Sequence, residues 1–133
     1  MKSNQNVVDT TETIIKTRIN PTESKKKVIR SITNIITRNH EITITDNDDV
    51  IINSDITVID TLLKKIKKEE IEQVAYNILT KNRKDDTTKF YINKQAAYNN
   101  TFHIIDENIS PLTDIEVTIK SDDIDAVIDY MLN

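Results

Sequence analysis

The residue types best suited to a chemical task gather in one short segment, residues 87–102. Four of the six aromatic side chains of the chain lie there, interleaved with lysines and amides. Aromatic rings stack on nucleobases, amides hydrogen-bond to base edges, and cations contact phosphates. The segment therefore predicts an RNA-binding surface, with contacts from Lys89, Tyr91, Asn93, Lys94 and Gln95.

Strand alternation decides which of these side chains share a surface. We expect residues 87–98 to form a strand whose apolar side chains face the core and whose polar side chains face outward. The first predicted strand, residues 13–19, alternates in the same way, so Lys16 and Arg18 also point outward. We assign base stacking to Tyr91, hydrogen bonds to the two amides and phosphate contacts to the cations.

The same face also fits a contact with another protein. Its polar side chains could meet solvent or a second subunit, so the alternative is a protein-interaction module or homodimer with no RNA role. Charge is distributed unevenly along the chain. Residues 61–99 hold nine Lys and Arg against five Asp and Glu, whereas residues 100–133 hold one lysine against eight acids. The middle segment suits phosphates, and the acidic C-terminal segment suits a basic partner.

Glycine and cysteine are absent from all 133 residues, which excludes several functional classes. Phosphate-cradling loops, dinucleotide-binding loops, calcium loops and the nucleophile elbow of hydrolases all need glycine where the backbone turns with positive φ. Disulfides and cysteine-based zinc sites are excluded as well. No nucleophile lies in a diagnostic motif, so we expect a protein that is not an enzyme and uses no cofactor.

Three groups of metal-ligand residue types have simpler explanations. A calcium loop counted from Asp46 needs glycine and glutamate where the chain has Ile51 and Thr57, so the acidic cluster is expected to be a turn. The two histidines have no cysteine beside them, and the last acidic run begins a helix, where carboxylates are favoured. We expect no metal site and no catalytic residue among His40, His103, Asp46, Asp48, Asp49, Asp122, Asp123, Asp125 and Asp129.

The net charge is −4, so any attraction for phosphates must be local. No apolar run exceeds three residues, far below the roughly 20 that a membrane span needs. The polar start of the chain lacks the apolar core of a signal peptide. We therefore expect a cytoplasmic protein with no membrane contact.

The periodicities predict a single α+β domain over residues 12–133, behind a flexible terminus of residues 1–11. Strands and helices lack regular βαβ alternation, so we expect a mostly antiparallel sheet with helices packed on one face. The predicted order is β-α-β-β-α-α-β-β-β-α, over residues 13–19, 21–38, 41–45, 50–53, two helices within 57–82, 87–98, 101–106, 114–120 and a last helix capped by Ser121.

Three segments in this order are NPTES (20–24), TTKFYINKQAAY (87–98) and SPLTDIEVTI (110–119). Together they resemble a family of small archaeal proteins of uncharacterised function, described as predicted RNA-binding or exosome-associated proteins. The similarity covers about residues 12–132. The resemblance implies a fold like that of large-subunit ribosomal protein number five, RNA as a partner and a place in an RNA-processing assembly. It implies no catalytic residue.

The chain departs from this family at two turns. Family members commonly have glycine after Ser-Pro-Leu and after the segment that resembles Ala-Ala-Tyr, where this chain has Thr113 and Asn99-Asn100. Asparagine tolerates left-handed backbone and can replace glycine. Threonine is β-branched, so we expect a strained or altered turn at Thr113.

Overall fold

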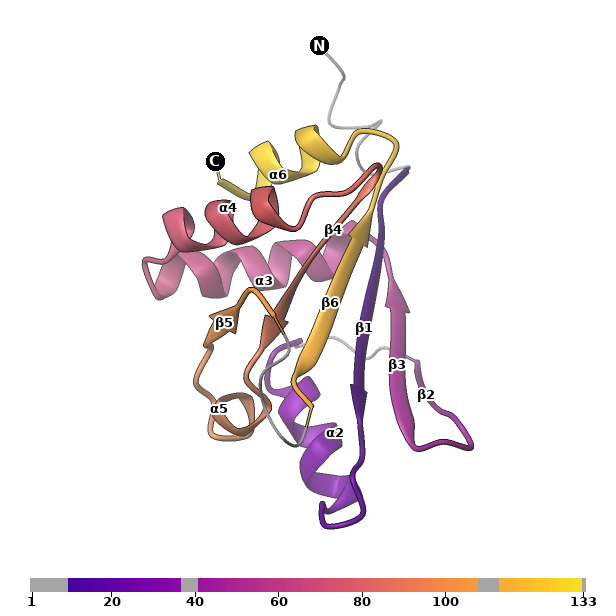
Figure 1. Ribbon diagram of the computed structural model, residues 1–133. Coiled ribbons are helices and arrows are strands. Elements are labelled where there is room, and N and C mark those ends of the chain that lie inside the picture. The colour runs from indigo at the N-terminus through magenta and orange to yellow at the C-terminus, as the bar shows by residue number, and fades with distance from the viewer. Residues whose placement is uncertain (1–9, 37–40, 108–112, 133) are drawn as a thin grey trace.

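The computed structural model describes residues 10–36, 41–107 and 113–132. Within these ranges, six strands form one open antiparallel sheet in the order β2-β3-β1-β6-β4-β5, and five helices pack against it (Figure 1). The predicted α+β class is confirmed. The strands are β1 (Glu12–Arg18), β2 (Ile42–Ile44), β3 (Asp49–Ser54), β4 (Thr87–Ile92), β5 (Ile104–Ile105) and β6 (Ile115–Lys120). The helices are α2 (Lys25–Thr33), α3 (Ile56–Lys68), α4 (Glu72–Lys81), α5 (Lys94–Tyr98) and α6 (Ile124–Leu132).

Buried and exposed residues alternate along the central strands, which gives the sheet one covered face and one open face. In β1, Thr13, Ile15 and Thr17 are buried, whereas Lys16 and Arg18 are exposed. β3 and β6 pair with β1 on either side and repeat the alternation. Because successive side chains of a strand point to opposite faces, the buried set meets the helices and the other set faces solvent.

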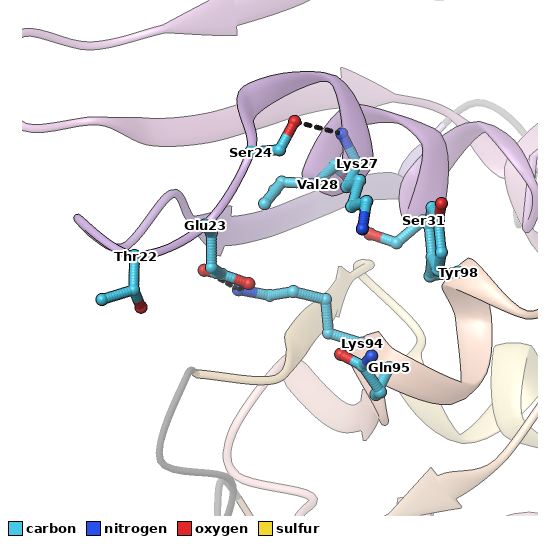
Figure 2. A pocket seen from close by; sticks show the side chains of 9 residues that line it. All are labelled: Thr22, Glu23, Ser24, Lys27, Val28, Ser31, Lys94, Gln95 and Tyr98. Carbon is cyan, nitrogen blue, oxygen red and sulfur yellow. Dashed lines mark hydrogen bonds and ion pairs between the residues drawn. The ribbon is translucent and has the colours of Figure 1, made fainter.

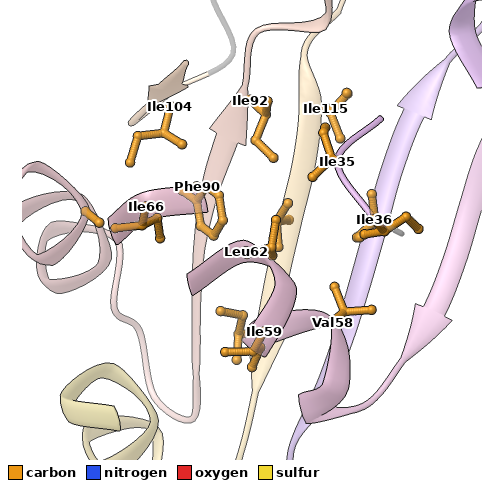
Figure 3. Packing of buried hydrophobic residues seen from close by; sticks show 14 of the residues in the cluster. Ile35, Ile36, Val58, Ile59, Leu62, Ile66, Phe90, Ile92, Ile104 and Ile115 are labelled. Carbon is orange, nitrogen blue, oxygen red and sulfur yellow. The ribbon is translucent and has the colours of Figure 1, made fainter. Parts of the chain in front are cut away.

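Helix α3 supplies much of the core on the covered face. Ile59, Leu62 and Ile66 lie on one side of this helix and are almost completely buried. Figure 3 shows them in the same layer as Phe90 of β4 and Ile115 of β6. Helices α3, α4 and α6 stack together on this side of the sheet (Figure 1), so the opposite side of the strands keeps its polar residues exposed.

Helix α2 starts later than the sequence predicts. The helix expected over residues 21–38 begins at Lys25, because Ser24 and not Asn20 is the N-cap: Ser24 Oγ accepts a hydrogen bond from Lys27 N at 3.4 Å. Residues 21–24, predicted as the first helical turn, form a separate turn instead, from which the Glu23 side chain bonds to Lys94. The helix ends at Thr33, and residues 37–38 lie outside the described ranges.

The predicted break between the two central helices is confirmed. α3 ends at Lys68 and α4 begins at Glu72, and between them Glu70 has a φ of 57°, a left-handed conformation that ends helices. α3 begins at Ile56, one residue before the predicted range, and Asp55 is its N-cap. Asp55 Oδ1 accepts a hydrogen bond from Thr57 N at 2.9 Å.

The strand expected over residues 87–98 is wrong after Ile92, where β4 ends and the short helix α5 follows. Asn93 causes the change, because its side-chain oxygen accepts a hydrogen bond from Ala96 N at 2.8 Å and caps the helix. The other predicted strands are present, although β5 spans only Ile104–Ile105. The order of elements therefore gains a helix between the fourth and fifth strands.

The last helix has a different cap from the predicted one. Asp123 Oδ1 accepts a hydrogen bond from Ala126 N at 3.2 Å, and Ser121 Oγ accepts one from Asp123 N at 3.3 Å. Ser121 Oγ also accepts a hydrogen bond from Thr11, which is buried. Thr11 belongs to the segment expected to be flexible, and residues 1–9 of that segment lie outside the described ranges.

Left-handed backbone is adopted here without glycine. Asn100 has a φ of 62°, which confirms that asparagine can replace glycine at that turn. Thr113 has a φ of 67°, which confirms the expected strain of a β-branched residue. The described residues with positive φ are Asp48, Glu70, Asp85, Asn100 and Thr113.

Candidate nucleic-acid interface

The outward residues of β1, β3, β4 and β6 form a surface that we call the open face. One row of cross-strand neighbours runs through Tyr91, Glu116, Lys16 and Ile51. Neighbours in such a row lie about 5 Å apart. Charged and polar groups from β4, β6 and β1, with the apolar Ile51 of β3 beside them, are therefore within reach of a single ligand.

Lys16, Arg18 and Lys89 lie on the open face and are exposed, as the alternation predicts. Arg18 Nε is 3.3 Å from Asp49 Oδ1 on β3, yet 53% of the Arg18 side chain is exposed. Lys16 makes no ion pair with a described residue. Three cations from two distant segments thus share one surface, which is the arrangement that contact with phosphates needs.

Tyr91 also points to this face, but the residue is only 8% exposed. Its hydroxyl donates to Glu116 Oε2 at 3.1 Å, and Lys89 Nζ lies 6.0 Å from the ring centroid. Burial raises the pKa of the Tyr91 hydroxyl, and the Glu116 carboxylate raises it further. A ring so covered offers a base little area for stacking, so its geometry favours a role in holding Glu116 and Lys89.

A hollow of about 330 Å³ opens on the same face. It brings the predicted residues Lys16, Arg18 and Tyr91 together with carboxylates. Cations contact phosphates, and carboxylates accept hydrogen bonds from base amino groups, so the mixed lining suits a nucleotide better than a simple anion. The hollow is lined by Lys16, Thr17, Arg18, Asp49, Tyr91, Thr113, Asp114 and Glu116.

Lys94 lies apart from this face and is buried. Its Nζ donates to the Arg18 carbonyl oxygen at 2.8 Å and to Glu23 Oε1 at 3.0 Å, and only 7% of its side chain is exposed. Burial lowers the pKa of Lys94, although Glu23 opposes the shift. The ammonium is thus occupied inside the protein, and the predicted phosphate contact has no support in its geometry.

Glu23 completes this buried pair from the turn before α2. Burial would raise the pKa of its carboxyl group, but hydrogen bonds from Asn20 and from Lys94 outweigh burial and hold the pKa below its ordinary value. Asn20 donates to Glu23 Oε1 through its backbone N at 3.0 Å and through Nδ2 at 2.7 Å. The pair therefore joins the end of β1, the turn before α2 and the start of α5.

The two amides predicted beside Tyr91 belong to a different surface. The side-chain oxygen of Asn93 is used as the cap of α5, and Gln95 is exposed on that helix. Gln95 lines a second hollow of about 290 Å³ between α2 and α5, shown in Figure 2. Alternation failed here because a helix replaces the second half of the expected strand.

The site residues predicted from the sequence did not include two sets of surface cations. Lys120 ends β6 on the open face and is exposed; continuing the alternation of β6 past Thr118 would have found it. Lys25, Lys26 and Lys27 are exposed in the first turn of α2. The sequence feature that could have identified them is a run of three lysines directly after a residue that can cap a helix.

In the described ranges, no group of three or more His, Asp or Glu side chains is arranged to hold a metal ion. His103 is exposed, and His40 lies outside these ranges. Asp125 forms an ion pair with Arg83, at 2.6 Å between Oδ1 and Nε. None of the helices in these ranges has the length and apolar character needed to cross a bilayer.

Comparison with known proteins places this geometry in a family. A family model described as RNA binding matches residues 12–121, which run from β1 to the residue after β6. The chain is 38% identical over 114 residues to a UPF0201 protein of Methanothermobacter thermautotrophicus, covering 85% of this chain and 84% of that protein. This chain belongs to the UPF0201 family. A UPF0201 protein of Sulfurisphaera tokodaii is 30% identical over 125 residues, covering 91% and 86%.

Solved UPF0201 structures share the fold. A UPF0201 protein from Methanococcus jannaschii is 30% identical and superposes with a TM-score of 0.75, covering 91% of this chain and 92% of the other. A second UPF0201 crystal structure gives a TM-score of 0.78 at 30% identity, with the same coverage. The predicted resemblance to an archaeal family of uncharacterised proteins is confirmed.

Proposed function

We propose that this UPF0201 protein binds RNA through the open face of its sheet, without catalysing a reaction. The observation that carries the proposal is the set of exposed cations on that face, contributed by β1, β4 and β6. The family model supports the proposal, because the model is described as RNA binding and its match covers the strands that form the open face. The proposed contacts are Lys16, Arg18, Lys89 and Lys120.

The cations would contact phosphates, and the carboxylates of the hollow would select amino groups on bases. The acidic residues Glu12, Asp49 and Glu116 reduce the positive charge of the open face, and Arg18 forms an ion pair with Asp49. We therefore expect modest affinity that depends strongly on salt. Four phosphate contacts on a single strand correspond to a slope of about −3 in log K against log salt concentration.

The test is a titration of a labelled single-stranded RNA at several salt concentrations. The double variant Lys16→Gln/Lys89→Gln should bind more weakly and reduce the magnitude of the slope by about 1.4. Lys64→Gln, at an exposed site on α3, is the control and should behave as the wild type. Equal RNA affinity of the double variant and the wild type would refute the open face as the contact surface.

A contact between two copies of the chain is the second candidate for the open face. The observation that favours it is the partial exposure of Ile14 and Ile51, apolar residues that project from β1 and β3 among the charges. Sedimentation at several protein concentrations decides between the candidates. A dimer that persists at high salt and is dissociated by Ile14→Lys would favour the interface, whereas a monomer that binds RNA would exclude it.

Two further expectations stay predictions. A place in an RNA-processing assembly and a likeness to the ribosomal protein fold were implied by the family resemblance. Co-purification of the tagged protein with and without ribonuclease treatment tests the first. Partners that are lost with the RNA would indicate an association through RNA, and partners that persist would indicate a direct protein contact.

A further inference from the structure

Helix α2 carries positive charges where its own dipole disfavours them. Lys25, Lys26 and Lys27 fill its first turn, which contains no acidic residue. The amino end of a helix bears a partial positive charge, so cations there are destabilising and acids are stabilising. Neither helix stability nor core packing explains three exposed lysines at this position.

The lysines of α3 provide the contrast. Lys65, Lys67 and Lys68 lie in its last turn, where the dipole is negative and favours cations, and two glutamates follow at once. The electrostatics of its own helix therefore account for this cluster. The two helices carry similar numbers of lysines at opposite ends, and only those of α2 lack a structural explanation.

The protein itself does not neutralise the charge on α2. In the described part of the chain, no carboxylate forms an ion pair with Lys25, Lys26, Lys27 or Arg30. Glu23, the acid nearest in sequence, is turned toward Lys94, as Figure 2 shows. The charge therefore remains available to a ligand from outside.

The hollow between α2 and α5 lies beside these lysines. Lys27 and Gln95 contribute to its lining, and Lys27 Nζ is 5.4 Å from the centroid of the Tyr98 ring (Figure 2). The buried pair links this hollow to the open face, because Lys94 contributes to its lining and donates to the carbonyl oxygen of Arg18. The two surfaces thus adjoin at the end of β1.

We propose that the first turn of α2 and the hollow beside it bind the phosphates of an RNA strand that continues from the open face around the end of β1. This inference rests on the proposed function. The charge on the surface is complementary to a phosphate backbone, and the hollow is open enough for a nucleotide to approach Lys27 and Gln95.

Two triple variants of the full chain test this path. Lys25→Gln/Lys26→Gln/Lys27→Gln removes three exposed charges from α2, and Lys64→Gln/Lys67→Gln/Lys68→Gln removes three from α3 as the matched control. The affinity of each for a labelled single-stranded RNA is measured at about 50 and 200 mM salt, with a urea unfolding midpoint for each. The loss of affinity over this salt range should be roughly twentyfold smaller for the α2 variant than for the wild type.

The unfolding midpoint separates binding from a structural role. It should stay equal or rise in the α2 variant, because three charges no longer oppose the helix dipole. A fall in this midpoint together with unchanged RNA binding would assign the lysines to stability and overturn the proposal. Equal salt dependence of the two triple variants would overturn it as well.

Inorganic phosphate, compared with chloride at equal ionic strength, tests the source of the phosphate. Binding of phosphate by the wild type but not by the α2 variant, together with an RNA affinity that the α2 substitutions leave unchanged, would assign the surface to free ions and overturn the RNA path. If the wild type binds no RNA, the proposed function fails together with this inference. If Lys16→Gln/Lys89→Gln weakens binding and the α2 variant does not, only this inference fails.

Discussion

Replacing Lys94 with methionine tests the assignment of this residue to the interior. The substitution keeps the apolar stem and removes the ammonium, so Glu23 loses its charged partner and the Arg18 carbonyl oxygen loses its donor. Removing one member of a buried ion pair costs about 3–5 kcal/mol. Glu23 keeps its bonds from Asn20 and its side chain is 11% exposed, so we expect the lower end of this range, about 3 kcal/mol.

The assay is urea unfolding followed by far-ultraviolet circular dichroism. With a slope of about 2 kcal/mol per molar urea, the midpoint of Lys94→Met should fall by about 1.5 M. Lys81→Met is the control, because Lys81 pairs with Asp106 at the surface and 66% of its side chain is exposed, so its midpoint should hardly move. A shift for Lys94→Met no larger than that for Lys81→Met would refute the reasoning.

The same variant tests the sequence-based assignment of Lys94 as a phosphate contact. Because its Nζ is already bonded within the protein, the folded Lys94→Met variant should keep the RNA affinity and the salt dependence of the wild type. A salt slope smaller in magnitude by about 0.7, in a variant that is fully folded under the assay conditions, would restore Lys94 to the interface.

Three further outcomes follow from individual residues. The pKa of Glu23 is lower in the folded protein than the ordinary 4.5, so its carboxylate contributes stability above that pH which is lost as the pH falls through the folded value. The loss of urea stability between about pH 6 and pH 3 should be smaller in Glu23→Gln, and an unchanged pH profile would contradict this. Thr113→Gly should stabilise by about 0.5 kcal/mol, since relief of left-handed strain exceeds the entropy that glycine adds to the unfolded chain, whereas Thr118→Gly within β6 should destabilise. Leu62→Ala should cost about 2–5 kcal/mol because the side chain is fully buried, and the neighbouring half-buried Leu63 should cost less on the same substitution; equal urea midpoints would contradict the assigned core face.

The fold was predictable because most strands alternate cleanly. β1 and β6 bury every second residue, and this pattern survives in the sequence without any knowledge of their partners. The placement of Lys16, Arg18 and Lys89 follows from the same alternation. Helix starts were less certain, because Asn20 and Ser24 are both good caps and only Ser24 is used.

The candidate site was predictable only in part, because three of its assignments depend on competing local signals or on distant contacts. The sequence of Asn93 followed by Lys-Gln-Ala-Ala fits the start of a helix and also the continuation of an alternating strand. In the structure it forms a helix. Lys94 is buried by Glu23, a residue 71 positions earlier that only the folded chain brings near. The covering of Tyr91 by Lys89 and Glu116 likewise depends on the neighbouring strand.

The position of β6 has a consequence for synthesis of the chain. β6 lies between β1 and β4, and Glu12 pairs with Lys120, so the centre of the sheet joins the two ends of the domain. While the chain is emerging from the ribosome at about 5–20 residues per second, β1 and β4 each present an unpaired edge toward the missing strand. Such edges pair readily with other chains. The sheet closes only when residues 115–120 have been released, so until then both edges are open to pairing with other chains.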